Sequence, residues 1–112
     1  MKFKSKTTKG VTVIALSGNV MGGPDATALN ELVHKLLDDG IRKLVIDLGD
    51  VKFVNSSGLG MLIGSMTTMR NAGGELKVAA ASKKVTELIE VTRLHKVFDL
   101  QPTVAAAVAS FQ

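Results

Sequence analysis

Short apolar, β-branched runs alternate along this chain with longer stretches whose apolar residues recur every three or four positions. The short runs cover residues 3–9, 11–17, 43–48, 75–80 and 96–100, and they predict β-strands. The longer stretches begin near Pro24, Ser56, Ser82 and Pro102, and they predict amphipathic helices. The pattern therefore predicts an α/β fold, with a mixed sheet of about five strands covered by about four helices.

The order of these elements predicts how the strands pair. The first two strands meet near Lys9-Gly10 and are expected to form an antiparallel hairpin. From Pro24 onward helices and strands alternate, which favours parallel strands joined by crossover helices. Gly40 is expected to end the first helix in a left-handed conformation, and Ser82 is expected to cap a later helix. No linker or repeat interrupts the pattern, so residues 1–112 are expected to form a single domain.

The central stretch Asn55-Ser56-Ser57-Gly58 joins a predicted buried strand to a predicted helix. Small amide and hydroxyl side chains there lie beside backbone N–H groups that have no acceptor within the helix. The partial positive charge of a helix start favours an anion, so a phosphate on either serine would be stabilised. Serines at helix starts are also common simply as caps, so the pattern alone leaves both interpretations open.

The same stretch carries a family resemblance. Residues Phe53 to Gly60 resemble the signature of the STAS domain, and in particular that of the anti-sigma-factor antagonists. Leu16-Ser17-Gly18 and Asn71-Ala72-Gly73-Gly74 resemble two further family motifs, so the similarity extends along nearly the whole chain. The resemblance implies a STAS fold and a protein that binds an anti-sigma factor, which is itself a serine kinase, and thereby releases a sigma factor. It also implies phosphorylation at Ser56 and reversal by a serine phosphatase. Ser57 matches a position that varies between Ser, Thr and Ala in the family, and it is the alternative site.

Two features depart from the family pattern and keep an alternative open. Asn55 stands where the family usually has aspartate, and Val20-Met21-Gly22-Gly23 lacks the acidic residue that usually follows Leu-x-Gly. Both departures remove negative charge near Ser56. The alternative is a STAS interaction module of another signalling or transporter system, without serine phosphorylation. A small nucleotide-binding or hydrolytic enzyme is a further alternative from a different class.

The amino-acid composition excludes some classes of function and argues against others. The chain has no cysteine, so disulfides and thiol catalysis are excluded, and neither His34 nor His95 has a partner in the pattern for a metal site. The net charge is +4, yet the lysines are scattered and lack interleaved aromatic residues, which argues against direct nucleic-acid binding. No segment is apolar enough for a signal peptide or a membrane span. We expect a cytoplasmic binding protein without cofactor or metal.

The predicted helix that begins at Ser56 carries two further expectations. Its apolar residues, taken at the helical period, place Met61 away from the face that covers the sheet. Met61 is therefore predicted to join Asn55, Ser56, Ser57 and Gly58 on the partner-binding surface. Gly60 and Gly64 share one flank of the helix, where close backbone packing would explain both glycines.

Overall fold

The computed structural model describes all 112 residues, Met1 to Gln112. Its elements in chain order are β1 (Lys2–Thr8), β2 (Val11–Val20), α1 (Pro24–Asp38), β3 (Lys43–Val54), α2 (Ser56–Asn71), β4 (Glu75–Ala79), α3 (Lys83–Val91), the short 3-10 helix η1 (Leu94–Lys96), β5 (Asp99–Gln101) and α4 (Val104–Ser110). The prediction of a mixed five-stranded sheet with four helices is confirmed. None of the helices combines the length and the apolar character that crossing a bilayer requires.

The strands lie in the sheet in the order in which they occur in the chain, from β1 to β5. β1 and β2 form the expected antiparallel hairpin, whereas β2, β3, β4 and β5 all pair in parallel. Each parallel connection passes through a helix, as the lengths of the connecting segments require. The carboxyl ends of the parallel strands consequently meet at one edge of the sheet.

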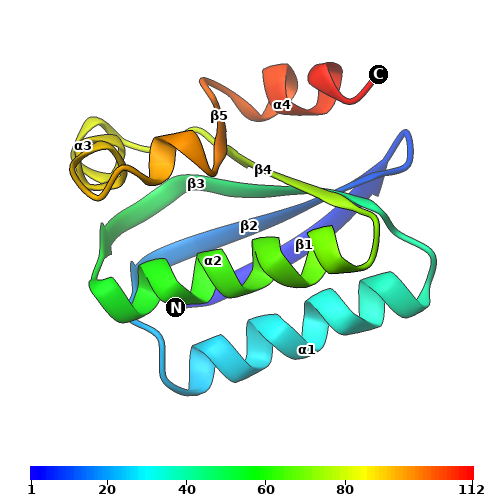
Figure 1. Cartoon of the computed structure of the whole chain (residues 1–112), viewed down its shortest axis with the longest axis horizontal. Helices are drawn as coiled ribbons and strands as arrows, with labels where there is room; N and C mark the ends of the chain where they lie inside the picture. The colour runs from blue at the N-terminus through cyan, green and yellow to red at the C-terminus, as the bar shows by residue number, and fades with distance from the viewer.

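Helices cover both faces of the sheet. Figure 1 shows α1 and α2 side by side along one face, with α3 and α4 on the other. The main core lies largely between the sheet and the α1–α2 layer, and its fully buried side chains include Ile14, Ile46, Leu62 and Met69. A second and smaller cluster lies under α4; it consists of Val11, Val45, Ala79 and Ala107. The alternation of side chains along each strand supplies both cores, because successive residues face opposite sides.

The two strands that precede the central motif are longer than the sequence pattern predicts. β2 continues to Val20 rather than ending at Ser17, and β3 continues to Val54 rather than ending at Leu48. Register shifts occur between Ala15 and Ser17 and again beyond Gly18, so the extended ends still pair. Polar residues and glycines interrupt the apolar alternation there, but bulges let the ladder continue past them. The predicted loop that begins at Gly18 therefore begins only after Val20.

The C-terminal helix is attached to the sheet by a buried lysine. Lys77 is only 6% exposed, and its Nζ donates a 2.6 Å hydrogen bond to the Ser110 Oγ on α4. The same ammonium lies 3.3 Å from the Asp99 carboxylate and 4.4 Å from the centre of the Phe111 ring. These contacts satisfy a charge that burial would otherwise destabilise. They hold α4 over β3, β4 and β5.

Candidate protein-binding site

The central motif lies where the ends of β2 and β3 meet the start of α2. The Asn55 N–H donates to the Val20 carbonyl at 3.2 Å, which joins the two strand ends. The Asn55 side chain turns back and its Oδ1 accepts the Gly58 N–H at 2.7 Å. Asn55 is therefore the N-cap of α2, as its residue type and position predict. Ligand sites in open α/β sheets favour this edge.

Both serines of the motif are exposed at the first turn of α2. Ser56 and Ser57 are the first two residues of the helix, so their backbone N–H groups have no acceptor within it. Ser57 is also the nearest neighbour of the buried Gly22: a Cβ placed on Gly22 would lie 2.9 Å from the Ser57 Cβ. The loop before α1 thus packs against Ser57.

Gly58 fixes how closely α2 approaches the sheet. It is buried, and a Cβ added to it would overlap the Val20 carbonyl oxygen and lie 2.6 Å from the carbonyl carbon. Only a residue without a side chain allows this approach, which in turn places the Asn55 cap and the serines. Gly58 is therefore a structural element of the site and presents no side chain to a partner.

Two expectations about α2 are wrong. Met61 is only 7% exposed and belongs to the main core, and Ser65 on the same flank is also buried. The flank that begins at Gly58 is covered because α2 packs against α1 as well as against the sheet, so its buried face is wider than one stripe. Conversely, Cβ atoms added to Gly60 and Gly64 would meet nothing within 4 Å. No close packing explains those two glycines, and Met61 offers almost no surface to a partner.

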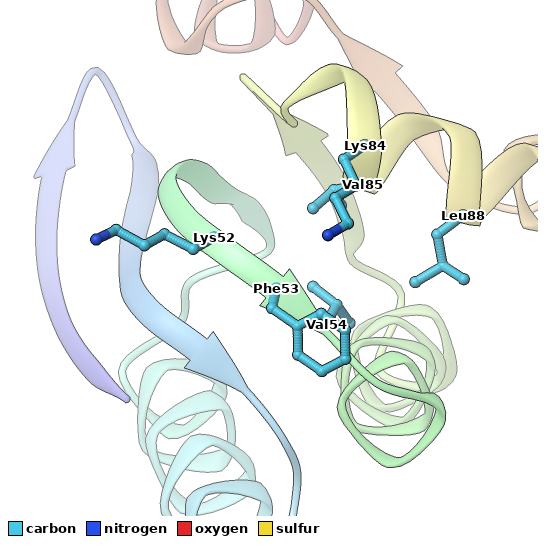
Figure 2. Close-up of a pocket in the computed structure, with 6 residues that line it drawn as sticks. All are labelled: Lys52, Phe53, Val54, Lys84, Val85 and Leu88. Carbon is cyan, nitrogen blue, oxygen red and sulfur yellow. The ribbon is translucent and has the colours of Figure 1, made fainter.

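An apolar hollow beside the serines was not expected from the sequence. Figure 2 shows Phe53 and Val54 at the end of β3 facing α3, whose Val85 and Leu88 line the other side. Phe53 is 40% exposed although it is a large apolar residue. Met21, in the loop that follows β2, is 47% exposed. A signal in the sequence did exist, because Phe53 lies two residues before Asn55, but its exposure depends on β3 extending to Val54.

Two lysines lie at the apolar hollow near the serines. Lys52 and Lys84 line the hollow, and both are exposed. Residues 20–24, 51–58 and 80–86 contain three lysines, and Asp25, Asp50 and Glu87 directly adjoin these ranges. Elsewhere, His34 and His95 are both exposed, and no group of three His, Asp or Glu side chains is placed to hold a metal ion. The site therefore offers apolar surface, hydroxyls and basic charge.

The fold and this site define a small mixed α/β domain that presents a helix-start serine at the carboxyl edge of its sheet. The chain belongs to the STAS domain family, whose model matches residues 2–107. An anti-sigma factor antagonist from Mycobacterium paratuberculosis, known from its crystal structure, is 30% identical; the alignment covers 97% of this chain and 92% of that one, with a TM-score of 0.82.

Two further similarities agree with this membership. The anti-sigma F factor antagonist of Paenibacillus polymyxa is 24% identical over 105 residues, which cover 89% of this chain and 86% of that protein. The phosphorylated form of the Bacillus cell fate determinant SpoIIAA has the same fold, with a TM-score of 0.76 at 17% identity, and the match covers 99% and 100% of the two chains. The family and the fold that the motif around Ser56 predicts are thereby confirmed.

Proposed function

We propose that this protein is an anti-sigma-factor antagonist: a cytoplasmic regulator that binds an anti-sigma factor through the surface around Ser56 and so releases a sigma factor. The observation that supports this most directly is the exposed Ser56 at the start of α2, next to exposed Phe53 and Met21. Exposed large apolar side chains beside polar groups are typical of surfaces that a protein partner covers. The antagonists among its relatives support the same function.

The switch that we propose is phosphorylation of Ser56 by the anti-sigma factor acting as a serine kinase, with Ser57 as the alternative site. A phosphate adds close to two negative charges. It would accept hydrogen bonds from the free N–H groups of the first helical turn and be stabilised there. In the complex the same phosphate would be desolvated against the partner, which opposes binding. A serine phosphatase would restore the binding form.

The charges around Ser56 also indicate the kind of partner surface. Lys52 and Lys84 line the hollow and no acidic residue lines it, so an acidic patch on the anti-sigma factor would complement this site. Phosphorylation would place negative charge opposite that patch and reverse the attraction. Asn55 helps to keep the surface around Ser56 basic. An aspartate at this position would add a negative charge there, although it would cap the helix equally well.

The test is binding of the purified cognate anti-sigma factor by titration calorimetry. Ser56→Ala should bind like the parent, and Ser56→Asp should bind at least about tenfold more weakly, which corresponds to about 1.4 kcal/mol. Ser57→Asp is the matched control for a negative charge one residue along. Equal binding by Ser56→Ala and Ser56→Asp would rule out the charge switch.

One observation favours a second candidate, a STAS interaction module of another signalling or transporter system that is not phosphorylated. Asn55 replaces the aspartate that usually precedes the modified serine. Incubation of the parent and Asn55→Asp with the cognate kinase and ATP, followed by phosphopeptide mapping, separates the two. Phosphate on Ser56 of the parent supports the antagonist; phosphate on neither protein, in the presence of an active kinase, supports the second candidate.

A further inference from the structure

The face of the sheet that carries α4 is covered over only part of its width. α4 packs against β3, β4 and β5, and Lys77 holds it there. The same face of β1, and of β2 beyond Val11, is not covered by a helix. Val13 and Ala15 on β2 are consequently only half-buried, whereas Val45 and Ala79 under α4 are fully buried.

A groove runs between α4 and the edge strand β1. Its floor is Val13 and Ala15, one wall is Val104 and Val108 of α4, and the other wall is formed by Lys4 and Lys6 of β1. These six residues are termed the β1–α4 groove. Its volume is about 470 Å³, which accommodates several side chains of a ligand. A second hollow shares Val104 and Val108 and continues the groove past the β1–β2 turn toward the C-terminus.

The register of the hairpin explains why apolar and basic residues lie together. Lys4 pairs with Ala15 and Lys6 pairs with Val13, and directly paired residues of antiparallel strands project from the same face. Lys2, one step along the same row, faces the same way. The groove therefore has an apolar floor and a basic rim. Asp47 lies beside Ala15 on the neighbouring strand, and its Oδ1 already accepts the Gly49 N–H at 2.8 Å.

We infer that the β1–α4 groove binds an acidic amphipathic helix of a partner protein, which would lie alongside α4 and complete the helical layer. The apolar stripe of such a helix fits the floor, and its carboxylates reach the lysine row. Charge complementarity disfavours a second copy of this chain, because the lining of its groove contains no carboxylate that could pair with the lysine row. A lipid surface is disfavoured as the ligand, because the apolar floor is recessed. Insertion into a bilayer needs apolar side chains that protrude.

The experiment uses fluorescein-labelled, helix-stapled peptides of about 15 residues, the length at which isolated helices become marginally stable. One panel carries a leucine stripe with glutamates on the remaining faces, and the matched panel carries lysines instead. The full chain is titrated with each peptide by fluorescence anisotropy. We expect binding of acidic peptides only, with methyl NMR shifts at Val13, Val104 and Val108.

Variants then locate the site. Lys4→Glu with Lys6→Glu should weaken acidic-peptide binding at least about tenfold, since attraction becomes repulsion at two positions. Lys35→Glu with Lys96→Glu is the matched control, because it changes the net charge equally at exposed positions elsewhere. Ala15→Leu should also weaken binding by filling the floor, and its unfolding midpoint shows whether the fold is kept.

Several outcomes would overturn the inference. They are the absence of binding by every acidic peptide, equal binding by the basic panel, and equal losses in the Lys4/Lys6 variant and in its control. Binding of phosphatidylserine vesicles that depends on Lys4 and Lys6, without peptide binding, would assign the groove to a lipid surface and contradict the proposal.

Discussion

Gly58→Ala and Gly60→Ala form a matched pair that tests how α2 is seated on the sheet. Both changes add one methyl group to the same helix, two residues apart. At Gly58 the new Cβ would overlap the Val20 carbonyl, whereas at Gly60 it would meet nothing within 4 Å. Neither glycine has a positive φ, so the helical backbone accepts alanine at both positions. The two variants differ only in what the methyl group contacts.

The expected magnitudes follow from these contacts. Alanine in a helix interior is favoured over glycine by about 0.5–1 kcal/mol, so Gly60→Ala should raise the free energy of unfolding by that amount. At Gly58 the same gain is opposed by overpacking against backbone that belongs to β2 and cannot move cheaply. Overpacking typically costs about 1–3 kcal/mol, and this backbone contact places the cost near the upper limit. Gly58→Ala should therefore lower the free energy of unfolding by about 2 kcal/mol.

The assay is equilibrium urea unfolding of both variants and the parent, followed by far-UV circular dichroism. The two variants should differ by about 3 kcal/mol, or about 10 °C in thermal midpoint for a domain of this size. Gly58→Ala should also weaken anti-sigma-factor binding beyond its effect on stability, because shifting α2 displaces the Asn55 cap and Ser56. Equal stability of the two variants would show that the helix start is not seated against Val20 as described.

Three further changes test other parts of the structure. Met61→Ala should lower the free energy of unfolding by about 2–4 kcal/mol, since the side chain is 7% exposed in the core; urea unfolding measures this, and a loss below 1 kcal/mol would place Met61 at the surface. Ser82→Ala should cost about 1 kcal/mol in the same assay, because the Ser82 Oγ accepts the Val85 N–H at 3.1 Å; an unchanged midpoint would contradict that cap. Lys77→Met should speed amide hydrogen exchange in α4 about tenfold while the unfolding midpoint changes little, and unchanged exchange would show that the lysine does not hold the helix.

Local chemistry made much of the fold predictable. Gly40 has a φ of +88°, as expected of a helix-ending glycine, and the Ser82 cap is formed. The apolar alternation also places the parallel strands and their helices, because each of these signals depends only on residues close in sequence. The Asn55 cap, whose side chain accepts the Gly58 N–H, was predictable for the same reason.

The features that sequence reasoning missed depend on neighbours that are distant in the chain. Met61 is buried because α1 covers a flank of α2 that the sheet alone would leave open. The end of β3 is ordered because Gly18, Asn19 and Val20 pair with it through bulges, although its own polar residues hide the strand pattern. The hollow at Phe53 exists because α3 returns to that strand end. Helical and strand periods contain no information about which distant element supplies the second side of a contact.

The two proposed surfaces should work independently of one another. Ala15 on the groove floor and Val20 beside Asn55 lie on the same strand, five residues apart, or roughly 16 Å at the rise of a β-strand. The electrostatic screening length at physiological salt is about 8 Å, so a phosphate on Ser56 would be largely screened before its field reaches Lys4 and Lys6. Ser56→Asp should therefore change acidic-peptide binding in the groove less than about twofold, while it weakens anti-sigma-factor binding at least about tenfold. A chain with this arrangement could keep one acidic partner attached while phosphorylation releases the other. Loss of peptide binding in Ser56→Asp would show instead that the middle and the end of β2 are coupled through the sheet.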